Sequence, residues 1–157
     1  MRVILMRHAE AVTVGTNGVT DDFDRHLTAH GRRQAAAVAA HVGQTLTLDA
    51  ILCSPFRRAR ETAEALKSLL PNGGEVIVAD ELASESGNIN GMAAALASTG
   101  SEVVAAVGHM PDIAFLCRWL VGGDLGSFET AQAVSIRFDN GITQGAGRVE
   151  WAFVPRV

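Results

Sequence analysis

The sequence alternates short apolar runs, rich in β-branched residues, with longer stretches in which apolar residues recur at helical spacing. The runs that are expected to form strands cover residues 3–6, 50–53, 76–79, 103–107, 133–138 and 149–154. Helices are expected over residues 32–43, 54–70, 90–98 and 111–120. This alternation predicts an α/β fold with a doubly wound, mainly parallel sheet and helices on both of its faces.

Capping and turn residues mark the ends of these helices. Thr28 is expected to cap the first helix. Ser54-Pro55 is expected to open the second helix, and Pro111 to lie in the first turn of the fourth. Residues that recur three and four positions apart along these helices are expected to face inward. They are Ala35, Val38, Ala39, Val42, Ala59, Thr62, Ala63, Leu66, Leu70, Ile113, Leu116, Cys117 and Leu120.

The chain is expected to form one domain over residues 1–157, because 157 residues can bury one substantial core. The last two apolar runs have no helix between them and are expected to add an antiparallel edge to the sheet. Asn140-Gly141 between these runs is a strong turn signal. The connection is long for a tight hairpin, so the sequence leaves the pairing of these two strands open.

Composition restricts the classes of function. Apolar residues make up 48% and charged residues 19% of the chain, as in folded globular proteins. The net charge of −4 argues against general nucleic-acid binding, which usually needs a basic surface. No apolar run approaches the ~20 residues that cross a bilayer and no signal peptide is apparent, so we expect a cytoplasmic protein without a membrane partner. Cys53 and Cys117 lie in apolar contexts and are expected to be buried free thiols.

Basic residues follow three of the expected strands at the point where each strand ends. Arg7-His8 follows the first strand, residues 54–58 (SPFRR) follow the second, and Gly108-His109 follows the fourth. In sheets of this class, ligands bind at the carboxyl ends of the strands. The sequence therefore places two histidines and up to three arginines at one edge of the sheet.

These side chains suit phosphoryl transfer. The planar guanidinium group of arginine pairs with two phosphate oxygens and keeps its charge at physiological pH. A neutral imidazole is a good nucleophile toward phosphorus and can form a covalent intermediate. One histidine to attack, with two arginines and a second histidine to bind oxygens, is a sufficient set. No P-loop, dinucleotide fingerprint, zinc-protease motif or nucleophilic cysteine motif competes for this role.

The remaining polar clusters are expected to be solvated. The three aspartates within residues 21–24 suggest a cation site, but they lack the ligand spacing of a calcium loop, so a solvated loop is favoured. His26, His30 and His41 are expected to face solvent, as is Arg60. We therefore expect no metal and no cofactor.

Four motifs, in the same order and on the same strand–helix alternation, resemble the histidine phosphatase superfamily. They read LMRHAEA, LTAHGRRQA, SPFRRARETA and VGHMP. The resemblance covers roughly residues 2–138 and points to the small phosphohistidine phosphatase branch, the SixA-like proteins. It implies a phosphoglycerate mutase-like fold.

The resemblance also implies the roles of four residues. His8 would be the phosphorylated nucleophile, and Arg7 would bind the phosphoryl group. In the Ser-Pro-x-x-Arg-Ala-x-x-Thr pattern the matching arginine is Arg58. His109 would be the second histidine, which contacts the phosphoryl oxygens.

Four other residues are weaker candidates for substrate binding. Arg25 lies in DRHLT, which matches a pattern of the branch, and Arg57 precedes Arg58, although solvation is favoured for its side chain. In mutase-like relatives a carboxylate after the third strand protonates the leaving group. Glu81 and Glu85 are the candidates here, with exposed loop acids as the alternative interpretation.

The expected activity is metal-independent hydrolysis of phosphohistidine on a protein through a covalent phosphohistidine intermediate. A small phosphomonoesterase that acts on a metabolite or nucleotide is one alternative. The other is a non-catalytic module that binds phosphate or a phosphoprotein, although such a module needs the arginines and not two apposed histidines. The sequence leaves the physiological substrate and the oligomeric state open.

Overall fold

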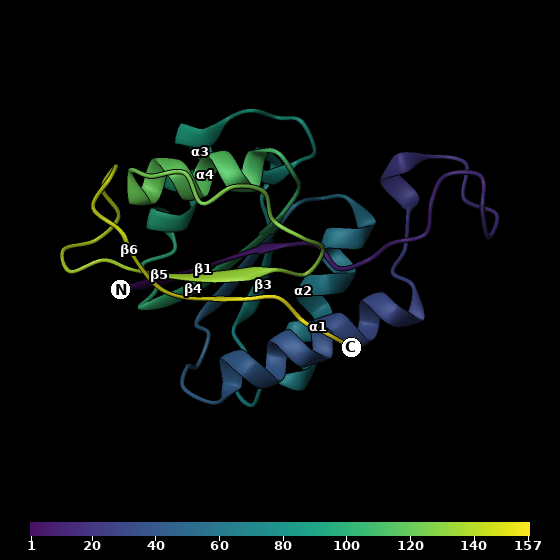
Figure 1. Cartoon of the computed structure of the whole chain (residues 1–157), viewed down its shortest axis with the longest axis horizontal. Coiled ribbons are helices and arrows are strands. Elements are labelled where there is room, and N and C mark those ends of the chain that lie inside the picture. Colours follow the sequence, from purple (N-terminus) through teal and green to yellow (C-terminus); the bar gives the residue numbers. More distant parts are fainter.

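The computed structural model describes residues 1–157, which form a six-stranded sheet with helices on both faces (Figure 1). The strands are β1 (Arg2–Arg7), β2 (Ala50–Cys53), β3 (Glu75–Val78), β4 (Val103–Gly108), β5 (Ala133–Arg137) and β6 (Arg148–Phe153). The helices are α1 (Ala29–Gly43), α2 (Arg57–Leu69), α3 (Ile89–Ser98) and α4 (Asp112–Val121), with short 3₁₀ turns η1 (Asp22–Asp24) and η2 (Asp80–Leu82). The predicted α/β class is confirmed.

The strand order is β3-β2-β4-β1-β5-β6. The first four of these strands are parallel, whereas β5 runs antiparallel to β1, and β6 antiparallel to β5. The antiparallel edge is therefore confirmed, and the last two strands pair with each other. Because β2, β4 and β1 are neighbours, the three strands that precede the basic residues end side by side.

Each face of the sheet carries its own apolar core. Alternate residues of a strand point to opposite faces, so Val3 and Leu5 of β1 pack beneath α3 and α4, while Ile4 and Met6 pack against α1 and α2. Figure 1 shows the two helix pairs on opposite sides of the sheet. Every residue predicted to face inward from α1, α2 and α4 is buried.

Two helix starts differ from the prediction. Helix α2 begins at Arg57 rather than at Ser54-Pro55, because a residue before proline disfavours the helical conformation and the Ser54 hydroxyl accepts the N–H of Phe56 instead. Pro111 lies one residue before α4, at the cap position, and not inside its first turn. The later start of α2 places Arg58 in its first turn.

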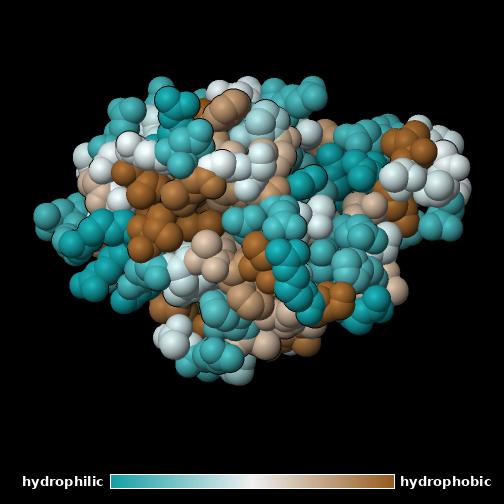
Figure 2. All heavy atoms as spheres, in the orientation of Figure 1, coloured by the Kyte–Doolittle hydropathy of each residue, from teal (hydrophilic) through white to brown (hydrophobic).

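The segment between β1 and α1, which contains η1, projects beyond the carboxyl ends of the parallel strands (Figure 1). Most of the face seen in Figure 2 is hydrophilic, and apolar side chains gather on it near α4 and β5. None of the helices combines the length and the apolar character that crossing a membrane requires. Both cysteines are free and buried, as expected.

Candidate active site

Three adjacent strands deliver the candidate residues to one edge of the sheet. His8 follows β1 directly, and its backbone N–H donates to the Gly108 carbonyl at the end of β4, 3.0 Å away. Ser54 follows β2 in the same way and donates its N–H to the Val107 carbonyl at 3.1 Å. The ring centroids of His8 and His109 lie 5.2 Å apart. The structure thus brings the two histidines together at the carboxyl edge.

The hydrogen bonds of His8 define which ring nitrogen is free. Its Nδ1 lies 2.8 Å from the Ala9 carbonyl oxygen, which can only accept, so Nδ1 carries the proton. The lone pair of Nε2 then faces the Nε–H of Arg58, which donates to it over 3.3 Å. His8 therefore presents an unprotonated nitrogen to the guanidinium group of Arg58.

Buried Thr62 joins the end of β1 to α2 and so sets the distance between His8 and Arg58. Its hydroxyl donates to the Arg58 carbonyl at 2.7 Å, one helical turn earlier, and accepts the N–H of Ala9 at 3.1 Å. Helical periodicity predicts that Thr62 faces inward. Its partner Ala9, just after β1, lies 53 residues away in the sequence, so no local pattern reveals this contact.

Two buried side-chain nitrogens have no hydrogen-bond partner, and both belong to candidate residues: Nε of Arg7 and Nδ1 of His109. One other nitrogen of each side chain is anchored. Nη1 of Arg7 donates to the Phe128 carbonyl at 3.0 Å, and Nε2 of His109 lies 2.7 Å from the Ser54 hydroxyl. Because buried polar groups are nearly always paired, these two atoms mark a place where an oxygen-rich ligand would complete the hydrogen bonding.

Burial keeps both imidazoles neutral at pH 7. Burial lowers the pKa of His8 to about 4. The hydrogen bond to Ala9 opposes this shift, and the charges of Arg58 and Arg7 add to it. Burial also lowers the pKa of His109 to about 3, and His8 and Arg58 contribute. The site therefore combines neutral ring nitrogens with permanently charged guanidinium groups.

These shifts predict a loss of stability on acidification. In the unfolded chain each histidine binds a proton near pH 6.5, whereas in the folded protein the two remain neutral down to about pH 4 and 3. Between pH 6.5 and 4 the unfolded state binds more protons, so the free energy of unfolding should fall as pH falls, by about 1.4 kcal/mol per pH unit for each histidine. Urea unfolding of the wild type and of His109→Gln between pH 7 and 4.5 measures this slope. Equal slopes for the two proteins would contradict the assignment to His109.

Asp22 and Arg25 join the site through η1. The Asp22 carbonyl accepts from Nη1 of Arg58 at 2.8 Å, and its carboxylate lies 3.3 Å from Nη2 of Arg58 and 3.2 Å from Nη1 of Arg25. Asp22 is exposed, as predicted for this loop, but its carboxylate also pairs with two arginines, which the sequence did not indicate. Asp21 and Asp24 are exposed, as predicted. Nothing in the spacing of these residues reveals the contact, because α2 approaches η1 only in the folded chain.

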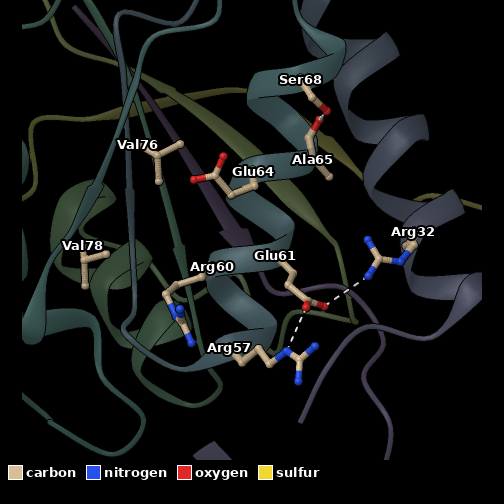
Figure 3. A pocket seen from close by; sticks show the side chains of 9 residues that line it. All are labelled: Arg32, Arg57, Arg60, Glu61, Glu64, Ala65, Ser68, Val76 and Val78. Carbon is tan, nitrogen blue, oxygen red and sulfur yellow. Dashed lines mark hydrogen bonds and ion pairs between the residues drawn. The ribbon is translucent and has the colours of Figure 1, made fainter. Parts of the chain in front are cut away.

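Arg57 points away from the histidines. Its Nε donates to Glu61 at 2.9 Å, and its side chain lines a surface groove of about 620 Å³ between α2, α1 and β3, together with Arg32, Arg60 and Glu64 (Figure 3). The two adjacent arginines thus point in different directions, because successive residues of a helix lie about 100° apart.

The structure does not bring Glu81 or Glu85 to the histidines. Glu81 lies in η2 and lines a cavity beside β3 and α3, and Glu85 is exposed, with a left-handed backbone (φ 64°). Burial is the largest influence on the pKa of His109, and the carboxylate that opposes it by raising this pKa is that of Asp22.

The three histidines outside the site, His26, His30 and His41, are half-buried and so differ from the prediction of solvated side chains. His30 contacts the Glu10 carboxylate at 3.0 Å, and the ring of His41 stacks on Phe153 with centroids 4.2 Å apart. Both are half-buried, because the terminal segment folds back over α1. No cluster of three or more His, Cys, Asp or Glu side chains is arranged to hold a metal ion.

Known proteins are similar to this chain in sequence and in fold. The chain is 28% identical over 159 residues to the phosphohistidine phosphatase SixA of Escherichia coli K12, and the match covers 99% of this chain and 94% of that protein. The structure of a protein histidine phosphatase SixA complexed with tungstate superposes with a TM-score of 0.83, at 28% identity, over 98% of this chain and 97% of the other. A SixA structure from Agrobacterium tumefaciens gives a TM-score of 0.81 at 25% identity, over 98% and 97% of the two chains. The family model "Histidine phosphatase superfamily (branch 1)" matches residues 3–112, and the chain belongs to this superfamily.

Proposed function

We propose that the protein hydrolyses phosphohistidine on another protein and that His8 is the nucleophile. The observation that carries the proposal is the state of His8: it is neutral at pH 7, its Nδ1 proton is held by Ala9, and the lone pair of Nε2 lies within 3.3 Å of a buried arginine. The similarity to SixA phosphohistidine phosphatases over nearly the whole chain supports the choice of substrate.

The reaction proceeds in two displacements at phosphorus. In the first, Nε2 of His8 attacks the phosphoryl group, the bond between phosphorus and the substrate imidazole breaks, and the substrate histidine leaves. In the second, water attacks phosphorus, the bond to His8 breaks, and inorganic phosphate and the free imidazole of His8 are regenerated. Nδ1 of His8 keeps its hydrogen bond to Ala9, which stabilises the positive charge on the ring while it carries the phosphoryl group.

The other three candidate residues bind the phosphoryl oxygens. Arg58 exchanges its bond to His8 for one to an oxygen, while Nε of Arg7 and Nδ1 of His109 gain the partner that each lacks. Phosphoryl transfer depends mainly on positioning and on stabilisation of charge on the equatorial oxygens. Arg7 and Arg58 supply the positive charge that stabilises these oxygens. Both guanidinium groups are partly desolvated, and burial lowers the pKa of each.

The leaving group distinguishes phosphohistidine from a phosphate ester. Cleavage of an alkyl ester expels an alkoxide, and a positioned acid that protonates it contributes roughly 10²–10⁴-fold in rate. Imidazole is a far better leaving group and needs no such acid. Neither Glu81 nor Glu85 contacts the histidines, which favours phosphohistidine over an ester as the substrate.

We expect a histidine-phosphorylated carrier protein to be hydrolysed much faster than an alkyl phosphate such as glycerol phosphate. Release of inorganic phosphate from both substrates, with the same enzyme preparation, measures the ratio. Glu81→Gln and Glu85→Gln should leave the rate on the phosphoprotein unchanged, and excess EDTA should not lower it.

Two results would replace this proposal. If an alkyl phosphate is the better substrate and either glutamine variant abolishes its hydrolysis, the protein is a phosphomonoesterase whose acid lies in the segment after β3. If neither substrate turns over but both bind, the protein is a phosphate-binding module. Recovery of activity on adding magnesium or zinc after chelation would contradict the metal-independent mechanism.

A further inference from the structure

Arg58 is held mostly by one residue outside the motifs that resemble the family. Its three guanidinium nitrogens all have partners: Nε donates to His8, Nη1 to the Asp22 carbonyl and Nη2 to the Asp22 carboxylate. Two of the three contacts thus come from Asp22, which precedes Arg58 by 36 residues. A planar group held at two nitrogens by one residue has a defined orientation toward the third contact.

Asp22 is itself held in place. The second oxygen of its carboxylate lies 3.2 Å from Nη1 of Arg25, and Nε of Arg25 donates to the Val12 carbonyl at 2.7 Å. Although partial burial raises the pKa of Asp22, its hydrogen bonds and ion pairs with Arg25 and Arg58 lower it overall, so the carboxylate is ionised at neutral pH. The carboxylate therefore bridges two guanidinium groups.

Without this carboxylate Arg58 would lie among like charges. Burial lowers the pKa of Arg58, the charges of Arg25 and Arg7 lower it further, and the charge and hydrogen bond of Asp22 raise it. The side chain of Arg58 has only 5% of its surface exposed, whereas that of Asp22 has 51% exposed. Ion pairs with a solvent-exposed partner contribute little to stability. The main effect of the pair between Asp22 and Arg58 is therefore on the orientation of the buried guanidinium group.

We propose that Asp22 is a positioning residue, which orients the Arg58 guanidinium toward the phosphoryl group on its way to His8. The role in the reaction rests on the function proposed above, whereas the contacts themselves do not. Orientation matters most in the transition state, where charge develops at defined oxygen positions. In the ground state, replacement of Asp22 by a neutral residue has two opposing effects on anion binding. The lost orientation of Arg58 weakens it, and removal of the negative charge strengthens it.

Asp22→Asn is therefore expected to lower kcat on the phosphoprotein about tenfold, because misplacing a catalytic group by a fraction of an ångström has effects of this order. The dissociation constant for tungstate, measured by calorimetry, should change less than about threefold. Asp24→Asn is the matched control, since Asp24 lies in the same 3₁₀ turn, is exposed, and makes no side-chain hydrogen bond or ion pair. It should match the wild type in both measurements.

A double-mutant cycle tests whether Asp22 acts through Arg58. In an Arg58→Ala background, Asp22→Asn should cause no further loss of kcat, because the group that it positions is absent. Arg58→Lys provides a second background if the alanine variant does not fold, as judged by thermal unfolding. Lysine keeps the charge but cannot contact His8 and the carbonyl and carboxylate oxygens of Asp22 at once.

Three results would overturn the proposal: a kcat of Asp22→Asn within twofold of that of Asp24→Asn, an equal loss in the wild-type and Arg58-substituted backgrounds, or a loss confined to tungstate binding. Each is distinguishable from a failure of the proposed function, in which His8→Ala stays active or the wild type does not hydrolyse the phosphoprotein. In that case the role of Asp22 in the reaction falls with the proposed function, whereas its contacts with Arg58 stand.

Discussion

Replacement of His8 by alanine is expected to remove nearly all phosphatase activity. His8 supplies the attacking nitrogen, whereas His109, which follows the neighbouring strand β4 and has its Nε2 2.7 Å from the Ser54 hydroxyl, is assigned to the phosphoryl oxygens. Phosphate release from the phosphoprotein measures the loss. Retention of even a tenth of the wild-type rate would falsify the assignment of the nucleophile.

The covalent intermediate provides an independent check on His8. A phosphoramidate is labile in acid and stable in alkali, so wild-type protein quenched during turnover of a radiolabelled substrate should carry label with these properties. His8→Ala should carry none. His30→Ala is the matched control: His30 is half-buried and contacts Glu10 on the outer surface, so its loss should leave labelling and turnover unchanged.

Arg58→Ala is expected to lower kcat/KM about a hundredfold, because loss of one charge-assisted contact to a developing charge costs ~3 kcal/mol in transition-state stabilisation. Arg57→Ala should lose much less, since Arg57 is paired with Glu61 at the groove on the outer side of α2. The two variants differ by one position and remove the same charge, so each is the control for the other. The opposite ranking would show that the phosphoryl group approaches along the groove of Figure 3 and not at His8.

Strand and helix periodicity predicted most of the fold. β2 has the predicted bounds, β1 extends one residue further at each end, and the apolar stripes of α1, α2 and α4 are all buried. These features are local, because each depends on which side chains one element turns toward the core. The pairing of β5 with β6 was not predictable, since it depends on where a long connection returns to the sheet.

The sequence also predicted which edge of the sheet carries the site. Arg7 ends β1, His8 and His109 directly follow β1 and β4, and Arg58 lies in the first turn of the helix after β2. The strand order then brings the four residues together. Their catalytic roles stay predictions that the variants above will test. Asp22 could not be identified in this way, because an aspartate in an acidic loop has the same local pattern whether it faces water or an arginine.

The sequence by itself thus determined the element types, the family and the residues that can perform phosphoryl chemistry, because these depend on side-chain identity and on spacing along the chain. The tertiary structure decided the protonation and the contacts of those residues. His8 is neutral because the fold buries it, and its Nε2 faces Arg58 because Thr62 and Asp22 hold that arginine from two other parts of the chain. Desolvation and hydrogen bonds between distant segments exist only after folding, so no local pattern in the sequence could reveal them.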